Sequence, residues 1–193
     1  MARVSPSNDA ERQGALTTGR SAVLLGVPHE LQGPRFPRYV RDSSYSILVT
    51  ALIRSNEVDF VFEESAGRGP SIAEEIAKSV LGAGHYLDID PPQHERPKHG
   101  IAPICVSGFP VDPCNSADVC SVSIVEEQRK REKLWLLRIA EQHFTNGLVI
   151  VGLSHTLSVS FGLLSVRIGI RDACNYIPFA KLGTQAHPIE NLD

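Results

Sequence analysis

Two fragments of this 193-residue chain place a histidine three residues after a glycine, at the end of an apolar run. The first, Gly26-Val27-Pro28-His29, closes the run SAVLL, and the second, Gly152-Leu153-Ser154-His155, closes GLVIV. Imidazoles bind divalent metals and serve as general bases. One such histidine is more often structural, capping a helix or packing in a turn, but two at equivalent positions favour a shared site. We expect each glycine to permit a sharp turn that a residue with a side chain would resist.

Two adjacent carboxylates, Glu63 and Glu64, close a third run, VDFVFEE at 58–64. Because side chains alternate along a strand, only one of them can face the histidines. Glu64 lies on the same face of the strand as Phe60 and Phe62, which favours it as the carboxylate that faces the histidines. A β-bulge or an early turn would reverse this alternation. A carboxylate beside two neutral histidines would make a divalent-metal site, or a general-base site without metal. An equally good alternative is a carboxylate that only stabilises a helix N-terminus.

One arginine, Arg131 in the segment KREKLW, lies on a predicted helix between the two histidine fragments. It could bind a carboxylate or phosphate of a substrate, or hold the glutamate through paired hydrogen bonds. Spacing alone favours a third interpretation, a solvated helix face, because charged residues surround it.

Periodicity predicts strands alternating with helices. The expected strands are 21–26, 58–64, 86–89, 147–152 and 166–170, and the expected helices are 45–56, 71–80, 124–143 and 155–165. This order is typical of an α/β fold with a mainly parallel sheet of about five strands and helices on both faces. Binding sites in such sheets lie beyond the carboxyl ends of the strands, so both histidines and the glutamate should meet at one edge.

We expect a mobile leader at 1–19 and a single α/β domain at 20–193, with a long irregular loop insertion at 91–122. The insertion would cover the site and set its specificity. Asp88 or Asp90, just before it, could join the site. The segment SAGRGPS could hold an anion but fits a plain turn before a helix better. Cys105, Cys114 and Cys120 are too widely spaced for a zinc knuckle, although zinc bound with His94 or His99 is a minor alternative.

Composition excludes several classes of function. With 19 Lys and Arg against 22 Asp and Glu, the net charge of −3 gives no basic surplus for nucleic acid or anionic lipid. The longest near-continuous apolar stretch, Leu148–Leu153, is far shorter than the roughly 18 residues that cross a bilayer. Four cysteines are too few for a disulfide scaffold, and MARVSPSNDAERQG holds no apolar signal region. We therefore expect a cytoplasmic location.

Four segments together resemble the Tiki/TraB superfamily, which includes Tiki proteases, TraB/pheromone-shutdown proteins, erythromycin esterases and ChaN-like haem-uptake proteins. They are LLGVPH (24–29), VDFVFEE (58–64), KREKLW (130–135) and LVIVGLSH (148–155), in the order that the family shows. The resemblance implies a metal-dependent hydrolase fold with His29, Glu64 and His155 at its centre and Arg131 beside them. Its members differ in activity, so it selects no substrate.

The leading hypothesis is a hydrolase whose His29, Glu64 and His155 hold a divalent metal or directly activate water, with Arg131 orienting an anionic group of a small-molecule or peptide substrate. A second hypothesis is a protein that binds haem or metal without turnover. A third is a partner-binding subunit with a degenerate site.

Overall fold

The computed structural model describes residues 19–32, 41–65, 69–92, 94–102 and 117–178. Its centre is a sheet of five parallel strands in the order β3-β2-β4-β1-β5. The strands are β1 (Ser21–Val27), β2 (Phe60–Glu63), β3 (Tyr86–Asp88), β4 (Asn146–Gly152) and β5 (Gly169–Asn175). The helices among the described residues are α2 (Ser43–Ser55), α3 (Ile72–Val80), α4 (Ala117–Ala140) and α5 (Thr156–Ser165). The predicted α/β class with a parallel sheet is confirmed.

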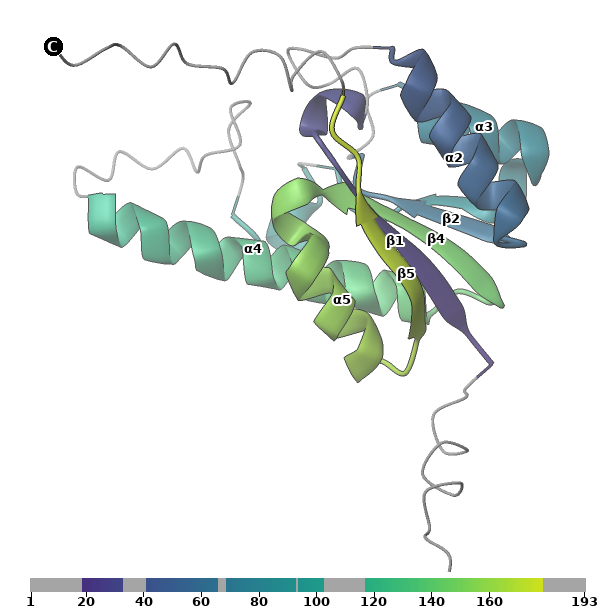
Figure 1. Ribbon diagram of the computed structural model, residues 1–193. Coiled ribbons are helices and arrows are strands. Elements are labelled where there is room, and N and C mark those ends of the chain that lie inside the picture. Colours follow the sequence, from purple (N-terminus) through teal and green to yellow (C-terminus); the bar gives the residue numbers. More distant parts are fainter. Residues whose placement is uncertain (1–18, 33–40, 66–68, 93, 103–116, 179–193) are drawn as a thin grey trace, which may run out of the picture.

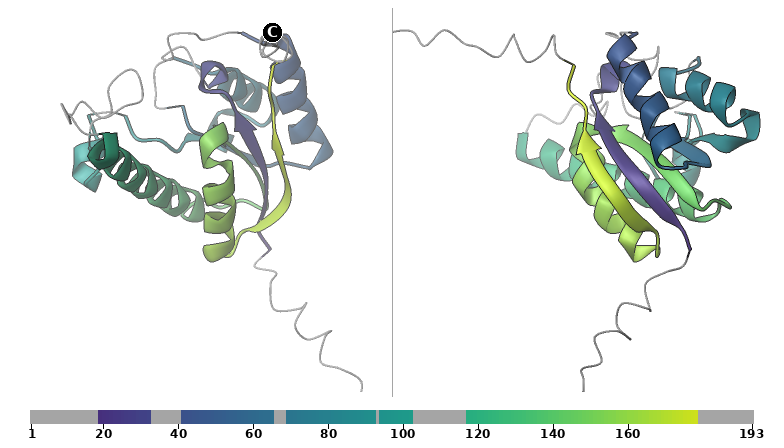
Figure 2. Two further views of the ribbon diagram at one scale, coloured as in Figure 1. Left: turned by 60° about the vertical axis from the view of Figure 1, so that its left-hand side comes forward. Right: turned by 45° about the vertical axis from the view of Figure 1, so that its right-hand side comes forward.

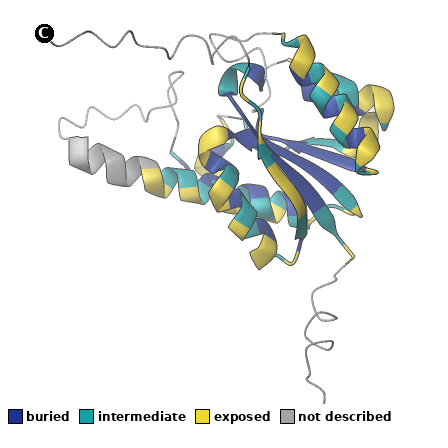
Figure 3. Ribbon diagram, in the orientation of Figure 1, coloured by how far each residue is buried: buried dark blue, intermediate teal, exposed yellow. Residues whose placement is uncertain are grey.

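Helices cover both faces of the sheet, α2 and α3 on one and α4 and α5 on the other (Figures 1 and 2). The first layer buries Tyr45, Val49 and Ile53 of α2. The second buries apolar side chains of α4 and α5, among them Trp135 and Val159. The central strands β1 and β4 are buried along nearly their whole length, which is why they occur in the sequence as continuous apolar runs (Figure 3).

Several boundaries differ from the predicted ones. The fifth strand starts at Gly169 instead of 166, because Arg167 adopts a positive φ of 61° in the turn that ends α5. Helix α2 starts at Ser43, where the Asp42 carboxylate accepts hydrogen bonds from the backbone N–H groups of Ser44 and Tyr45. Local capping and turn geometry thus moved element ends that hydrophobic periodicity could not place.

The structure is consistent with the predicted loop insertion, although α4 begins at Ala117 and so overlaps the last six residues of the predicted range 91–122. Helix α4 also ends at Ala140, not 143, where Arg20 donates hydrogen bonds to the carbonyl oxygens of Ala140 and Gln142. The described first part of the insertion packs against the domain. Ile101 is buried there, and the Ala102 N–H group donates a hydrogen bond to Glu127 of α4. Residues 103–116, and with them most of the predicted cover over the site, lie outside the described residues, as does the leader at 1–18. Within the described helices, none is long and apolar enough to span a membrane.

Candidate metal centre

The two histidines and Glu64 meet at the carboxyl edge of the sheet. His29 follows β1, Glu64 follows β2 and His155 follows β4, and these strands are neighbours in the order β2-β4-β1. One potential ligand atom from each residue lies within 4.8 Å of those of the other two. The imidazole centroids of His29 and His155 are 6.4 Å apart. The predicted convergence of the two histidine fragments is therefore confirmed.

Gly26 and Gly152 do not form the sharp turns that were predicted for them. Both lack the positive φ that a glycine turn would show, and Gly152 has φ −58° and ψ 146°. Instead, each makes space for a neighbour. A Cβ on Gly152 would lie 2.4 Å from Cε1 of His29, and one on Gly26 would overlap the side chains of Thr156 and Asn175. Close packing, rather than a sharp turn, requires glycine here.

Glu64, as parity predicted, is the carboxylate that faces the histidines. Its Oε2 accepts a hydrogen bond from the Gly152 N–H group at 2.8 Å, and its Oε1 lies 4.0 Å from Nε2 of His155. Burial raises the pKa of Glu64, but the positive charges of His155 and Arg131 act against it. Together with His29 and the Gly152 N–H group they lower this pKa to about 2. Glu64 is therefore ionised, as a metal ligand must be.

Glu63 points to the opposite face of the sheet, beneath α3. Its Oε2 accepts hydrogen bonds from Ser71, which caps α3, and from the Tyr86 hydroxyl group. Burial raises the pKa of Glu63 to about 8, even though these two hydrogen bonds lower it. The pKa values of the two adjacent glutamates thus shift in opposite directions, because their side chains lie on different faces of the sheet and meet different partners.

Each imidazole is oriented through its Nδ1 atom. Nδ1 of His29 lies 2.5 Å from Oε1 of Gln32, and Nδ1 of His155 lies 2.6 Å from Oε1 of Glu132 on α4. With Nδ1 engaged in both rings, Nε2 is the nitrogen that each can offer to a metal. Burial lowers the pKa of His155, but the hydrogen bond to Glu132 and the charge of Glu64 raise it overall. The Trp135 and His155 rings pack in a T-shaped arrangement, with 5.0 Å between centroids.

Arg131 is buried, so the solvated helix face that spacing favoured is wrong. Its Nη2 atom donates to Glu64 at 3.0 Å and to Asp90 at 2.9 Å. Asp90, itself fully buried, also accepts hydrogen bonds from Arg96 and from the Trp135 indole. Of the roles predicted for Arg131, the structure shows the one in which it holds the glutamate.

Sequence reasoning missed Gln32 and Glu132 as partners of the histidines. Gln32 stands three residues after His29, within the same short 3-10 turn, and this spacing was the available signal. For Glu132, contact with His155 depends on how α4 packs against α5, which no local pattern encodes. Asp90 joins the site by holding Arg131, whereas Asp88 binds the N–H and hydroxyl groups of Ser65.

The remaining predicted candidates lie elsewhere. His94 and His99 are exposed, and Cys105 and Cys114 fall outside the described residues, as does the side chain of Cys120. In the segment SAGRGPS, Ser71 caps α3 and residues 66–68 are outside the described part.

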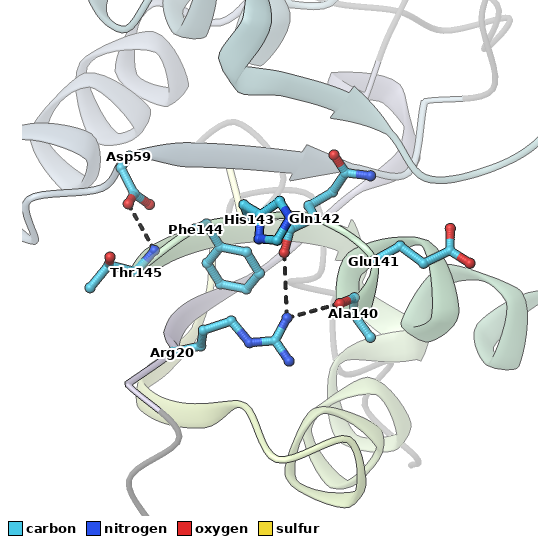
Figure 4. A pocket seen from close by; sticks show the side chains of 8 residues that line it. All are labelled: Arg20, Asp59, Ala140, Glu141, Gln142, His143, Phe144 and Thr145. Carbon is cyan, nitrogen blue, oxygen red and sulfur yellow. Dashed lines mark hydrogen bonds between the residues drawn. The ribbon is translucent and has the colours of Figure 1, made fainter.

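A surface hollow of about 630 Å³ lies at the opposite edge of the sheet, where Asp59 and Thr145 precede β2 and β4 (Figure 4). There Arg20 holds the end of α4 and its guanidinium group lies over the Phe144 ring. This hollow is thus remote from the histidines.

Two histidines and one carboxylate are a donor set of catalytic zinc sites, which keep a fourth position open for water. Tetrahedral ligand atoms about 2.0–2.2 Å from one ion lie roughly 3.4 Å from each other, so binding would shorten the 4.0 Å between Nε2 of His155 and Oε1 of Glu64 by roughly 0.6 Å. Glu64 and His155 are buried whereas His29 is half-buried, which leaves the His29 side for access by water. The residues therefore fit a divalent ion.

Comparison of the chain with family models, curated proteins and solved structures found no match.

Proposed function

We propose that this protein is a metal-dependent hydrolase of the Tiki/TraB-like type, with His29, Glu64 and His155 as the ligands of a divalent ion. The observation that carries the proposal is the convergence of these three side chains from three adjacent strand ends to within 4.8 Å. The order of the four resembling segments along the chain supports the same assignment. The substrate class we propose is a small molecule or a peptide.

A divalent ion at this position would supply Lewis-acid chemistry, lowering the pKa of water and polarising a scissile carbonyl or phosphoryl group. The chain itself would prepare the site. Glu64 provides a fixed negative charge, held by Arg131 and by the Gly152 N–H group. Gln32 and Glu132 orient the two imidazoles. With Arg131 committed to Glu64 and Asp90, we assign it to positioning the glutamate, and groups elsewhere would orient the substrate.

The burial of Glu64 and His155 favours a second candidate, a site that holds metal without turnover. It argues against haem bound by His155, because this residue is only 2% exposed and its ring packs against Trp135.

Metal analysis and an activity screen with and without a chelator test the proposal. We expect the purified chain to bind one equivalent of Zn²⁺ or Mn²⁺ and to hydrolyse an ester, peptide or phosphoester probe only when the metal is present. The isosteric pair Glu64→Gln and Glu63→Gln provides the matched control, since only the first removes a ligand. Absence of stoichiometric binding, or equal effects of the two substitutions, would contradict the assignment. Stoichiometric binding without hydrolysis of any probe would favour the second candidate.

A further inference from the structure

Helix α5 carries a row of large apolar side chains on the face that it turns away from the sheet. Leu157, Phe161 and Leu164 are 70%, 66% and 52% exposed, and Leu153, in the turn just before the helix, is 38% exposed. At 100° per residue, Leu157, Phe161 and Leu164 fall within an arc of about 60° on one side of α5, and Leu153 lies in the 3-10 turn that leads into it. We call these four side chains the α5 stripe. The opposite side of α5 buries Val159 and Leu163 in the core, so the helix is apolar on two faces.

A soluble helix usually has a polar outer face, and contiguous exposed apolar patches mark interaction sites. Helix α5 departs from this pattern throughout, because its ten residues, TLSVSFGLLS, include no charged side chain. Serine residues flank the stripe, and one of them, Ser158, donates a hydrogen bond to Glu132. Without charges, the helix can pack against an identical helix with no like-charge repulsion.

The α5 stripe is also nearly palindromic. The midpoint between Leu153 and Leu164 and the midpoint between Leu157 and Phe161 both fall next to position 159. Two copies of α5 packed antiparallel about a two-fold axis at that position would therefore pair Leu157 with Phe161 of the second copy and Leu153 with Leu164. An interface related by a two-fold axis needs such a self-complementary surface.

We propose that two copies of this chain associate through the α5 stripe, with their α5 helices antiparallel. The four side chains offer on the order of 400 Å² of apolar surface per copy. A standard stable interface buries roughly 800 Å² per partner, so the contact belongs to the small, reversible class. We expect a dissociation constant above about 1 μM, weaker than that of a standard interface.

The neighbouring edge strand β5 does not provide an alternative route to a dimer. Its pairing with β1 shifts register after Ile170, so the strand bulges at its edge. Arg171 and Asp172 are exposed there, and the Asp172 carboxylate accepts a hydrogen bond from the N–H group of Ala173. Bulges and charges are the devices that keep sheet edges from pairing. The chain thus protects its sheet edge while leaving the adjacent helix face apolar.

Sedimentation velocity of the full chain over a wide concentration range tests the proposal. We expect a monomer–dimer equilibrium that Leu157→Lys weakens by at least tenfold. The matched control is Ile47→Lys, because Ile47 on α2 is also 70% exposed but lies on the other face of the sheet. This control should associate like the unchanged chain, and circular dichroism should show both variants folded.

A mixing experiment tests the antiparallel arrangement itself. Leu157→Lys and Phe161→Glu should each weaken association by at least tenfold when alone. An equimolar mixture should restore the dimers, because only antiparallel packing brings the lysine of one variant against the glutamate of the other. A chain that stays monomeric at all concentrations overturns the proposal. This outcome would also be expected if residues 179–193 of the same chain, or a different protein, covered α5. Equal weakening by Ile47→Lys, or a mixture that stays monomeric, overturns it as well.

Discussion

A single methyl group at Gly152 should prevent metal binding at the candidate centre while leaving the fold intact. A Cβ at this position would lie 2.4 Å from Cε1 and 3.0 Å from Nε2 of His29, whereas ordinary contacts begin at 3.4 Å. The ring would have to retreat by about 1 Å, the difference between these distances. The backbone itself would tolerate alanine, since φ −58° and ψ 146° are accessible to any residue.

The size of the effect follows from the precision that metal ligation demands. Metal–ligand distances in functional sites hold to about 0.2 Å, so a displacement of roughly 1 Å removes His29 from the donor set. We expect Gly152→Ala to weaken Zn²⁺ or Mn²⁺ binding by about 100-fold or more, equivalent to about 2.8 kcal/mol. The thermal midpoint should change little, because the half-buried His29 side chain can swing outward.

Titration calorimetry with each metal measures the affinity, and NMR of the imidazole nitrogens reports on the His29–Gln32 hydrogen bond without metal. Gly84→Ala is the control, because a Cβ on Gly84 would meet no atom within 4 Å. If Gly152→Ala binds metal as tightly as the unchanged chain, with the His29 signals unmoved, the close packing of His29 against Gly152 is not what positions this ligand.

Three further substitutions test the surroundings of the site. Glu132→Ala frees Nδ1 of His155 and should weaken metal binding 10–100-fold in competition with a chelator; an unchanged affinity would exclude a role in orienting the imidazole. Glu63→Gln should flatten the pH dependence of stability. The pKa of Glu63, raised from 4.5 to about 8, lets the folded chain keep a proton that the unfolded chain releases, so this stabilisation is present below pH 4.5 and is lost as the pH rises through 8. Urea unfolding at several pH values measures the free energy of unfolding of the unchanged chain and of the variant. The same pH dependence in both would refute the raised pKa of Glu63. Asp90→Asn removes the carboxylate that pairs with buried Arg96 and one of the two that pair with buried Arg131, and it should cost about 3–5 kcal/mol of unfolding free energy in urea. A loss under about 1 kcal/mol would contradict a structural role for these ion pairs.

The α/β class followed from the sequence because its strands are short apolar runs separated by amphipathic segments. Runs such as SAVLLG and GLVIVG can only be buried on both faces, and they became the central strands β1 and β4. The edge strand β5 was placed three residues too early, since its exposed residues carry no hydrophobic signal and the preceding turn depends on a positive φ at Arg167. Burial is what makes a strand predictable.

At the site, the three candidate ligands were predictable from the sequence, whereas most of the residues that hold them in place were not. His29, Glu64 and His155 follow strand ends, and all parallel strands end at one edge, so topology alone brings them together. Strand parity then distinguished Glu64 from Glu63. The burial of Arg131 could not be predicted in this way. Its neighbours in the sequence of α4 are charged and not buried, so the local pattern does not indicate that Arg131 itself faces the sheet. Its burial arises from long-range pairing with Asp90, which only tertiary packing creates.

The two histidine fragments are informative as a pair because each makes room for the other. In the parallel register of β1 and β4, Val27 lies beside Gly152, so the turn that follows β1 must pass directly over that glycine. Gly152 therefore accommodates the ring of His29, while Gly26 accommodates Thr156, the residue after the second histidine. A larger residue at either glycine would push apart the two turns that bring the imidazoles together. A single glycine three residues before a histidine makes space for a neighbouring turn but does not show that a second histidine lies there, and so it predicts little by itself. Two such fragments on adjacent parallel strands each make space for the turn of the other. This is the physical reason that the repeated pattern predicted a shared site.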